Sequence, residues 1–75
     1  MKELVEYIVK SIASYPDEVK VTEEDEDGRV ILRVEVAPDD KGKVIGRQGR
    51  VAQSIRVLVR VAAVKQETRA ILEIV

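Results

Sequence analysis

Two glycines, Gly46 and Gly49, interrupt a segment whose sequence otherwise favours a helix. Pro38-Asp39-Asp40 supplies the start of a first helix, with an Asp as N-cap, and Gly46 comes only six residues after Asp40, so this helix must be short. A longer helix is predicted from Gly49 to about Lys65. Its expected core face is an apolar row at helical spacing: Val51, Ile55, Leu58 and Ala62. The chain must therefore turn sharply between two helices, and we expect Gly46 to close the first one in the left-handed conformation.

An amphipathic helix is predicted at residues 2–14. Its apolar stripe consists of residues at i, i+1, i+4, i+5 and i+8: Leu4, Val5, Ile8, Val9 and Ile12. The outward side carries Glu3, Glu6 and Lys10. Pro16 and Asp17 end the helix, because proline disfavours helical conformation in the residue before it.

A β-hairpin is predicted next, with strands near 18–24 and 29–37. Asp27 and Gly28 form a dipeptide that is typical of tight two-residue turns. The acidic run from Glu23 to Asp27 is a candidate binding feature, but we expect it to be a solvated hairpin tip.

The last segment, residues 69–75, is rich in Ile, Leu and Val and predicts a third strand. The resulting order is α-β-β-α-α-β in a single domain over 1–75. Three helices packed on a three-stranded sheet make a two-layer α+β fold.

The charge is divided unevenly along the chain. The formal net charge is -1, but residues 1–40 contain 12 acidic and 5 basic side chains (net -7), and residues 41–75 contain 8 basic and 2 acidic ones (net +6). Such asymmetry between halves suggests contact with nucleic acid or a membrane. The split falls immediately before the two glycines.

The missing residue types argue against catalysis. Without Cys or His the chain has no thiolate, no general base that titrates near neutral pH, and none of the commonest zinc ligands. The three serines have no evident base to activate them. We therefore expect no enzyme activity, metal, cofactor or small-molecule substrate.

No segment has the length and apolar character of a membrane span, and the N-terminus carries charge too early for a signal peptide. We expect a soluble, cytoplasmic protein without membrane contact.

The segment around the glycines suits an anionic ligand. Glycines that lack a Cβ let a sugar–phosphate backbone approach the main chain, and the following helix directs the positive end of its dipole at the same place. Lys43, Arg47 and Arg50 surround this spot. The spacing fits neither a Walker loop nor the Gly-x-Gly-x-x-Gly dinucleotide motif. A plain turn between helices, with no ligand, is the simpler alternative.

The heptapeptide Val44-Ile45-Gly46-Arg47-Gln48-Gly49-Arg50 resembles the signature of KH domains, whose Gly-x-x-Gly loop clamps about four nucleotides of backbone. The element order is similar to the type II, prokaryotic arrangement. The whole chain resembles the small single-domain bacterial KH RNA-binding proteins. The resemblance implies broad RNA binding and pairing with a second, larger KH-containing protein.

The resemblance also assigns roles to residues. Gly46 and Gly49 correspond to the loop glycines, Arg47 and Gln48 to the loop positions that touch the RNA backbone, and Ile45 to the apolar floor of the groove. Many KH domains have a larger aliphatic residue three positions after the second glycine. This chain has Ala52 there, so we expect a shallower groove with weak base selectivity.

The long helix offers two more candidate surfaces. Arg56 and Arg60 lie one turn apart and would extend a phosphate track, although a solvated helix face explains them equally well. A second apolar row is a candidate self-association or partner surface, unless the first helix covers it: Val57, Val61 and Val64.

Taken together, the sequence predicts a single-stranded RNA-binding protein of the RNA chaperone or regulator type. It would act through the glycine loop and an aliphatic groove, as a homodimer or with a larger KH partner. The main alternative is a protein-interaction or assembly module with weak or no RNA binding. A small-anion or nucleotide-binding protein is a more distant alternative.

Overall fold

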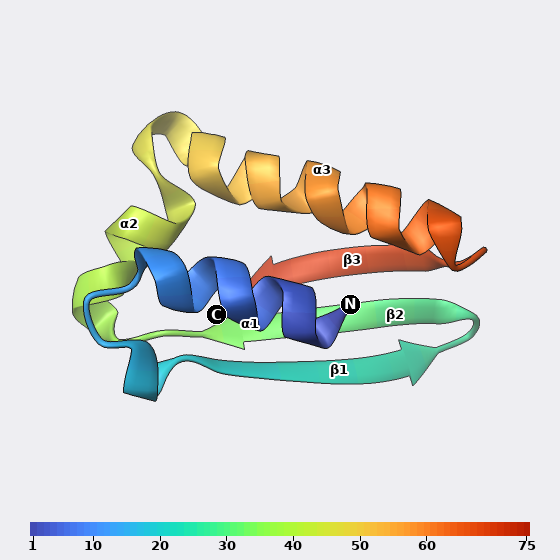
Figure 1. The fold of residues 1–75 in the computed structure, drawn as a ribbon, viewed down its shortest axis with the longest axis horizontal. Helices are drawn as coiled ribbons and strands as arrows, with labels where there is room; N and C mark the ends of the chain where they lie inside the picture. Colours follow the sequence, from blue (N-terminus) through green and yellow to red (C-terminus); the bar gives the residue numbers. More distant parts are fainter.

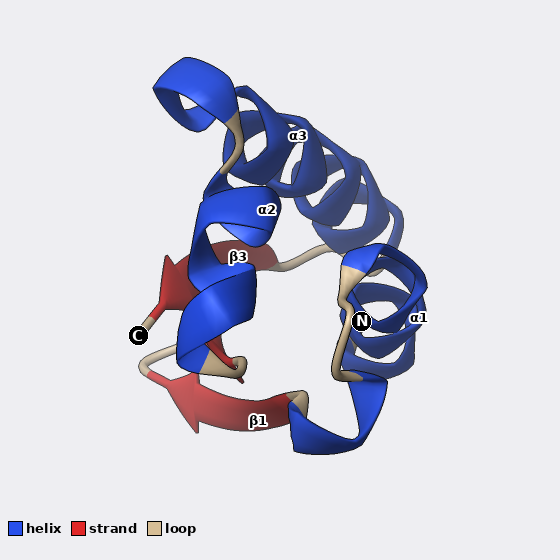
Figure 2. Cartoon of the chain, turned by 90° about the vertical axis from the view of Figure 1, so that its left-hand side faces the viewer, coloured by secondary structure: helices blue, strands red, loops and turns tan.

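The computed structural model describes residues 1–75 and has two layers, with three helices on one face of a three-stranded sheet (Figures 1 and 2). The strands are β1 (Lys20–Glu26), β2 (Arg29–Glu35) and β3 (Arg69–Ile74). The helices are α1 (Lys2–Ile12), α2 (Lys41–Ile45) and α3 (Arg50–Lys65). Single 3₁₀ turns lie at Pro16–Glu18, Pro38–Asp40 and Arg47–Gly49. The α+β class and the order α-β-β-α-α-β are those that the sequence predicts.

Strand β2 is the centre of the sheet. It pairs with β1 antiparallel, through a turn in which Asp27 (φ 53°) and Gly28 (φ 78°) both have positive φ. Two positive φ values are the requirement of a type I′ hairpin turn. On its other side β2 pairs with β3 in parallel, and α2 and α3 form the crossover between them.

The first strand begins and ends later than expected. It starts at Lys20 rather than residue 18, because Pro16–Glu18 forms a 3₁₀ turn, and it continues to Glu26 because the two-residue turn lets pairing reach the tip. Most of the acidic run therefore lies in strand β1, with its side chains exposed, and only Asp27 belongs to the turn. The second strand ends at Glu35 rather than at residue 37.

The core is entirely aliphatic. The nine residues of its central cluster come from all three helices and all three strands: Val5, Val9, Val21, Leu32, Val34, Val44, Ile55, Val59 and Leu72. On β2, Leu32 and Val34 are fully buried under the helices. Alternation along the strands thus places one face against the helices and leaves the other face open.

Helix α3 buries a different row from the expected one. The row at the sheet is Ala52, Ile55, Val59 and Ala63, of which only Ile55 was expected, and Leu58 is 49% exposed. Both rows are apolar and have helical spacing, so periodicity does not distinguish them. The observed row carries two alanines, which let the helix axis lie close to the sheet.

The second apolar row of α3 remains uncovered. Val57, Val61 and Val64 are 45%, 53% and 70% exposed, so the first helix does not cover them. On α1, Val5 and Val9 are buried, whereas Leu4 at the side of the expected stripe is 37% exposed.

Asp40 connects α2 to the segment after α1. It occupies the N-cap position of α2, as expected, but its side chain does not cap that helix. Instead, Oδ1 accepts the backbone N–H of Ser14 and Oδ2 accepts that of Tyr15, each at 2.9 Å. The side chain is inaccessible to solvent. The hydrogen bond from Ser14 lowers the pKa of Asp40 below its ordinary value, against the opposing effect of burial.

The turn between α2 and α3 depends on Gly46. This residue has φ 78° and ψ 172°, a conformation essentially restricted to glycine, rather than the left-handed helical conformation expected. A Cβ at this position would lie 2.8 Å from both the backbone N and the Cβ of Val51 and would clash with its Cγ2. Gly49 is left-handed helical (φ 74°, ψ 13°), and a Cβ there would meet nothing within 4 Å. Gly46 is therefore required by both conformation and space, and Gly49 by conformation alone.

We expect Asp40→Asn to lower Tm by roughly 5 to 10 °C, because the amide NH₂ leaves one of the two N–H groups without an acceptor. Asp39→Asn, at the exposed neighbouring position, is the matched control and should change Tm little. Since folding lowers the pKa of Asp40, the stabilisation is complete above the unfolded pKa of about 3.9 and is lost as pH falls through the lower folded pKa. Urea unfolding at pH 7 and near pH 2 should therefore show the difference between wild type and Asp40→Asn shrinking in acid; a constant difference would contradict this role.

The two loop glycines should respond differently to alanine. Gly46→Ala adds the clash with Val51 to the backbone strain, so we expect a loss of about 3 kcal/mol or more in unfolding free energy. In Gly49→Ala the alanine only has to adopt the left-handed conformation, so we expect the unfolding free energy to fall by about 1 kcal/mol. Urea unfolding of both variants measures the difference, and equal losses would show that the contact with Val51 is unimportant.

Candidate nucleic-acid interface

The tip of the α2–α3 turn presents two uncommitted polar side chains. The turn lies at one end of the helical layer, away from the sheet (Figure 1). At its tip Arg47 and Gln48 are exposed, and neither forms a side-chain hydrogen bond or ion pair. Gln48 has φ 57° and ψ 26°, so the backbone at the tip is held in a left-handed bend. Two adjacent donors are thus displayed on a turn of defined shape.

The positive end of the α3 dipole lies beside this tip. Helix α3 begins at Arg50 with no side-chain cap, and Arg50 is exposed and unpaired. The structure therefore brings Arg47, Gln48 and Arg50 to one corner of the molecule, next to a helix N-terminus that favours anions.

Lys43 has a different environment from the one expected. Its ammonium group donates a hydrogen bond to Oγ of Ser14, and its positive charge contributes to lowering the pKa of Asp40. Lys43 thus joins Asp40 in connecting α2 to the end of α1. Sequence reasoning could not find this contact because Ser14 lies 29 residues away along the chain.

The residues that flank the turn differ in exposure. Ile45 is 40% exposed, so an apolar side chain is accessible directly before Gly46. Val44 and Ala52 are buried in the core. The small side chain of Ala52 therefore contributes to helix packing on the sheet and adds little to an exposed surface.

A groove lies between α3 and β3, which is an edge strand of the sheet. Arg56 and Arg60 line a cavity of about 190 Å³ there, with Val59 beneath them and with the apolar wall that β3 provides: Ala70, Ile71 and Leu72. From the sequence, Arg56 and Arg60 are expected either to extend a phosphate track or to form a solvated helix face. The sequence does not reveal which strand lies at the sheet edge beside α3.

No three His, Cys, Asp or Glu side chains come together in a way that would hold a metal ion. None of the helices combines the length and the hydropathy needed to cross a bilayer.

The matching family model and the similar proteins point to the same family. The family model described as "KhpA/KhpB, KH domain" matches residues 2–74. Proteins named "RNA-binding protein KhpA" are similar over the full length of both chains: 49% identical in Clostridium acetobutylicum, 47% in Clostridium perfringens and 49% in Caldanaerobacter subterraneus. No solved structure matches significantly. With its two-layer α-β-β-α-α-β fold and a Gly-x-x-Gly turn between α2 and α3, the chain belongs to the KhpA/KhpB family of KH domains.

Proposed function

We propose that the protein binds single-stranded RNA, without catalysis or a cofactor, through the Gly46–Gly49 turn and the groove between α3 and β3. The observation that carries the proposal is the turn itself. Its tip displays Arg47 and Gln48 with no intramolecular partner, beside the unpaired Arg50 and the N-terminus of α3. The relatives named as RNA-binding proteins, which are similar along their whole length, support it.

In this mechanism the phosphates lie at the turn and the bases lie in the groove. Gly46 and Gly49 have no Cβ, so the RNA backbone approaches the main chain, while Arg47 and Arg50 supply positive charge. Arg56 and Arg60 line the groove farther along α3 and continue the track. Lys43 acts mainly by positioning α2, since its ammonium group already binds Ser14.

The groove favours broad over sequence-specific binding. Its lining combines aliphatic side chains with Arg56 and Arg60, and the two tyrosines of the chain lie in or after α1, away from the groove, so no aromatic ring is available to stack on a base. We therefore assign the protein to the RNA chaperone or regulator type, acting in the cytoplasm.

A second candidate function is assembly with another KH domain. The observation that favours it is the uncovered apolar row of α3, in which Val57, Val61 and Val64 are 45–70% exposed. A single domain that holds about four nucleotides binds weakly, and association of two domains raises the effective concentration of the second site. The partner would be a second copy or a larger KH-containing protein, and assembly and RNA binding would occupy different surfaces.

The loop is tested by replacing Arg47 and Gln48 with Asp, which places two negative charges where phosphate is expected. The left-handed conformation of residue 48 tolerates Asp well. We expect the affinity for oligouridine, measured by fluorescence polarisation, to fall on the order of tenfold or more. Lys20→Glu with Thr22→Glu makes the same change in net charge on β1, the far edge of the sheet, and should lower affinity much less. A folded loop variant that keeps wild-type affinity would refute the proposal.

The apolar row is tested by Val57→Glu with Val61→Glu. Both positions are exposed, so the variant should fold with little loss of stability, while buried charge should weaken any association through this row. Sedimentation at high protein concentration, alone and with a candidate KH partner, measures the effect, and RNA binding by the loop should persist. If wild type and variant are equally monomeric and equally folded, this row is not an assembly surface.

A further inference from the structure

Two arginines lie side by side at the start of the parallel strands. Arg29 of β2 and Arg69 of β3 are register partners, and both side chains are exposed. Neither forms an ion pair, although Glu26 is the partner of Arg29 across the hairpin. Like charges on directly adjacent strand positions are destabilising.

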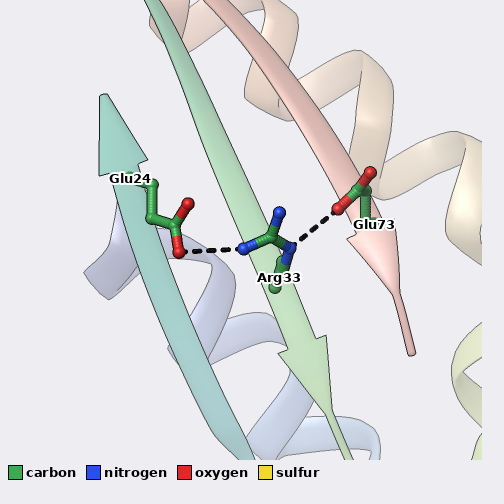
Figure 3. Close-up of polar contacts among 3 residues, drawn as sticks. All are labelled: Glu24, Arg33 and Glu73. Atoms are coloured by element: carbon green, nitrogen blue, oxygen red, sulfur yellow. Dashed lines mark hydrogen bonds and ion pairs between the residues drawn. The ribbon is translucent and has the colours of Figure 1, made fainter. Parts of the chain in front are cut away.

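Arg33 lies four residues after Arg29 on the same face of β2, and unlike Arg29 it forms ion pairs. Its guanidinium lies between the carboxylates of Glu24 and Glu73, at 2.8 and 3.0 Å (Figure 3). The hydrogen bond to Glu73 and the charge of Glu24 raise the pKa of Arg33 above its ordinary value. The sheet therefore neutralises one arginine with a carboxylate from each neighbouring strand, yet leaves the Arg29–Arg69 pair without any.

The unneutralised pair lines a cavity of about 380 Å³ at the C-terminal end of α3. Arg60 of α3 is a third arginine in its wall, and no carboxylate residue lines it. Thr68 Oγ1 donates a hydrogen bond to the carbonyl oxygen of Gly28 at 3.1 Å, which holds the turn before β3 against the hairpin turn. This contact holds the starts of the two strands side by side.

The chemistry of the cavity suits a phosphate that carries an apolar or flat group. Guanidinium groups present several N–H donors in a geometry that matches phosphate oxygens. The remaining wall is mainly aliphatic, with Val64 on α3 and Ile71 on β3. A nucleotide unit of RNA satisfies both parts of this surface.

The cavity is continuous with the groove between α3 and β3. Arg60, Ala70 and Ile71 line both cavities, so the two are contiguous along β3. Helix α3 has 16 residues and is about 24 Å long, which separates the arginine pair from the turn at its other end. This continuity favours RNA over an acidic protein segment as the ligand.

We propose that Arg29, Arg60 and Arg69 form a second phosphate-binding site, which holds a single RNA strand beyond the nucleotides bound at the Gly46–Gly49 turn. This inference rests on the proposed function, because it assigns a longer path to the same RNA. The repulsion between Arg29 and Arg69 is then relieved when a phosphate binds between them.

The test compares oligouridines of two lengths, one of about four nucleotides and one of about twelve, with wild type and the double variant Arg29→Gln, Arg69→Gln. We expect affinity for the long oligonucleotide to fall roughly three- to tenfold, and its slope of log K against log salt to become shallower by about 0.7, the value for one lost phosphate contact on a single strand. Affinity for the short oligonucleotide should stay unchanged. Tm should stay equal or rise by a few degrees, because a repulsive pair has been removed.

Lys10→Gln with Lys20→Gln removes two positive charges from α1 and β1 and is the charge-matched control, expected to leave the salt slope unchanged. If the arginine variant binds the long oligonucleotide with wild-type affinity and slope, or if the control lowers both equally, the second site is refuted. An arginine variant that keeps RNA binding but loses self-association in sedimentation also refutes it, in favour of a protein surface. The loop variant Arg47→Asp, Gln48→Asp separates the two proposals: its failure to reduce binding of either oligonucleotide overturns the proposed function itself.

Discussion

The parallel pairing of β2 with β3 is the constraint from which the arrangement of the molecule follows. Parallel neighbours cannot be joined by a tight turn, so the chain must leave the end of β2, cross the sheet and return to the start of β3. Helices α2 and α3 make this crossover, and Gly46 provides the sharp change of direction between them. The crossover places the Gly-x-x-Gly turn at one end of α3 and the start of β3 at the other. Any ligand that follows α3 therefore has the edge strand β3 as its second wall.

The placement of charge follows the same architecture. The hairpin carries 6 of the 12 acidic side chains of residues 1–40, and α2, α3 and the turn between them carry most of the basic side chains of residues 41–75. Within the sheet, Arg33 is neutralised by carboxylates from both neighbouring strands, whereas the arginines near the β3 edge have no such partners. A net charge of -1 thus conceals a molecule with a basic flank along α3 and an acidic hairpin. The acidic strand β1 lies at the opposite edge of the sheet from β3, so negative and positive charge are concentrated at different edges of the molecule.

Some features of the site can be predicted from the sequence, and others cannot. The residues of the turn were found because a Gly-x-x-Gly between helices is a local signal, readable within seven consecutive positions. The sequence does not predict the hydrogen bond from Lys43 to Ser14 or the burial of Asp40, because both depend on how α2 packs against the end of α1. The apolar row of α3 was also misassigned, since its alternatives have equal periodicity and only the fit of Ala52 and Ala63 against the sheet distinguishes them.

The sequence by itself determined the elements, their order, the two-layer class and the position of the turn. Those features arise from local physics: apolar periodicity, the positive φ of Asp27-Gly28 and the conformational freedom of Gly46. Only the tertiary structure decided which apolar row is buried, which strand lies beside α3, and which of the basic side chains remain unpaired. These outcomes depend on contacts between residues far apart in the chain, where packing volume and strand register select among alternatives that are locally equivalent.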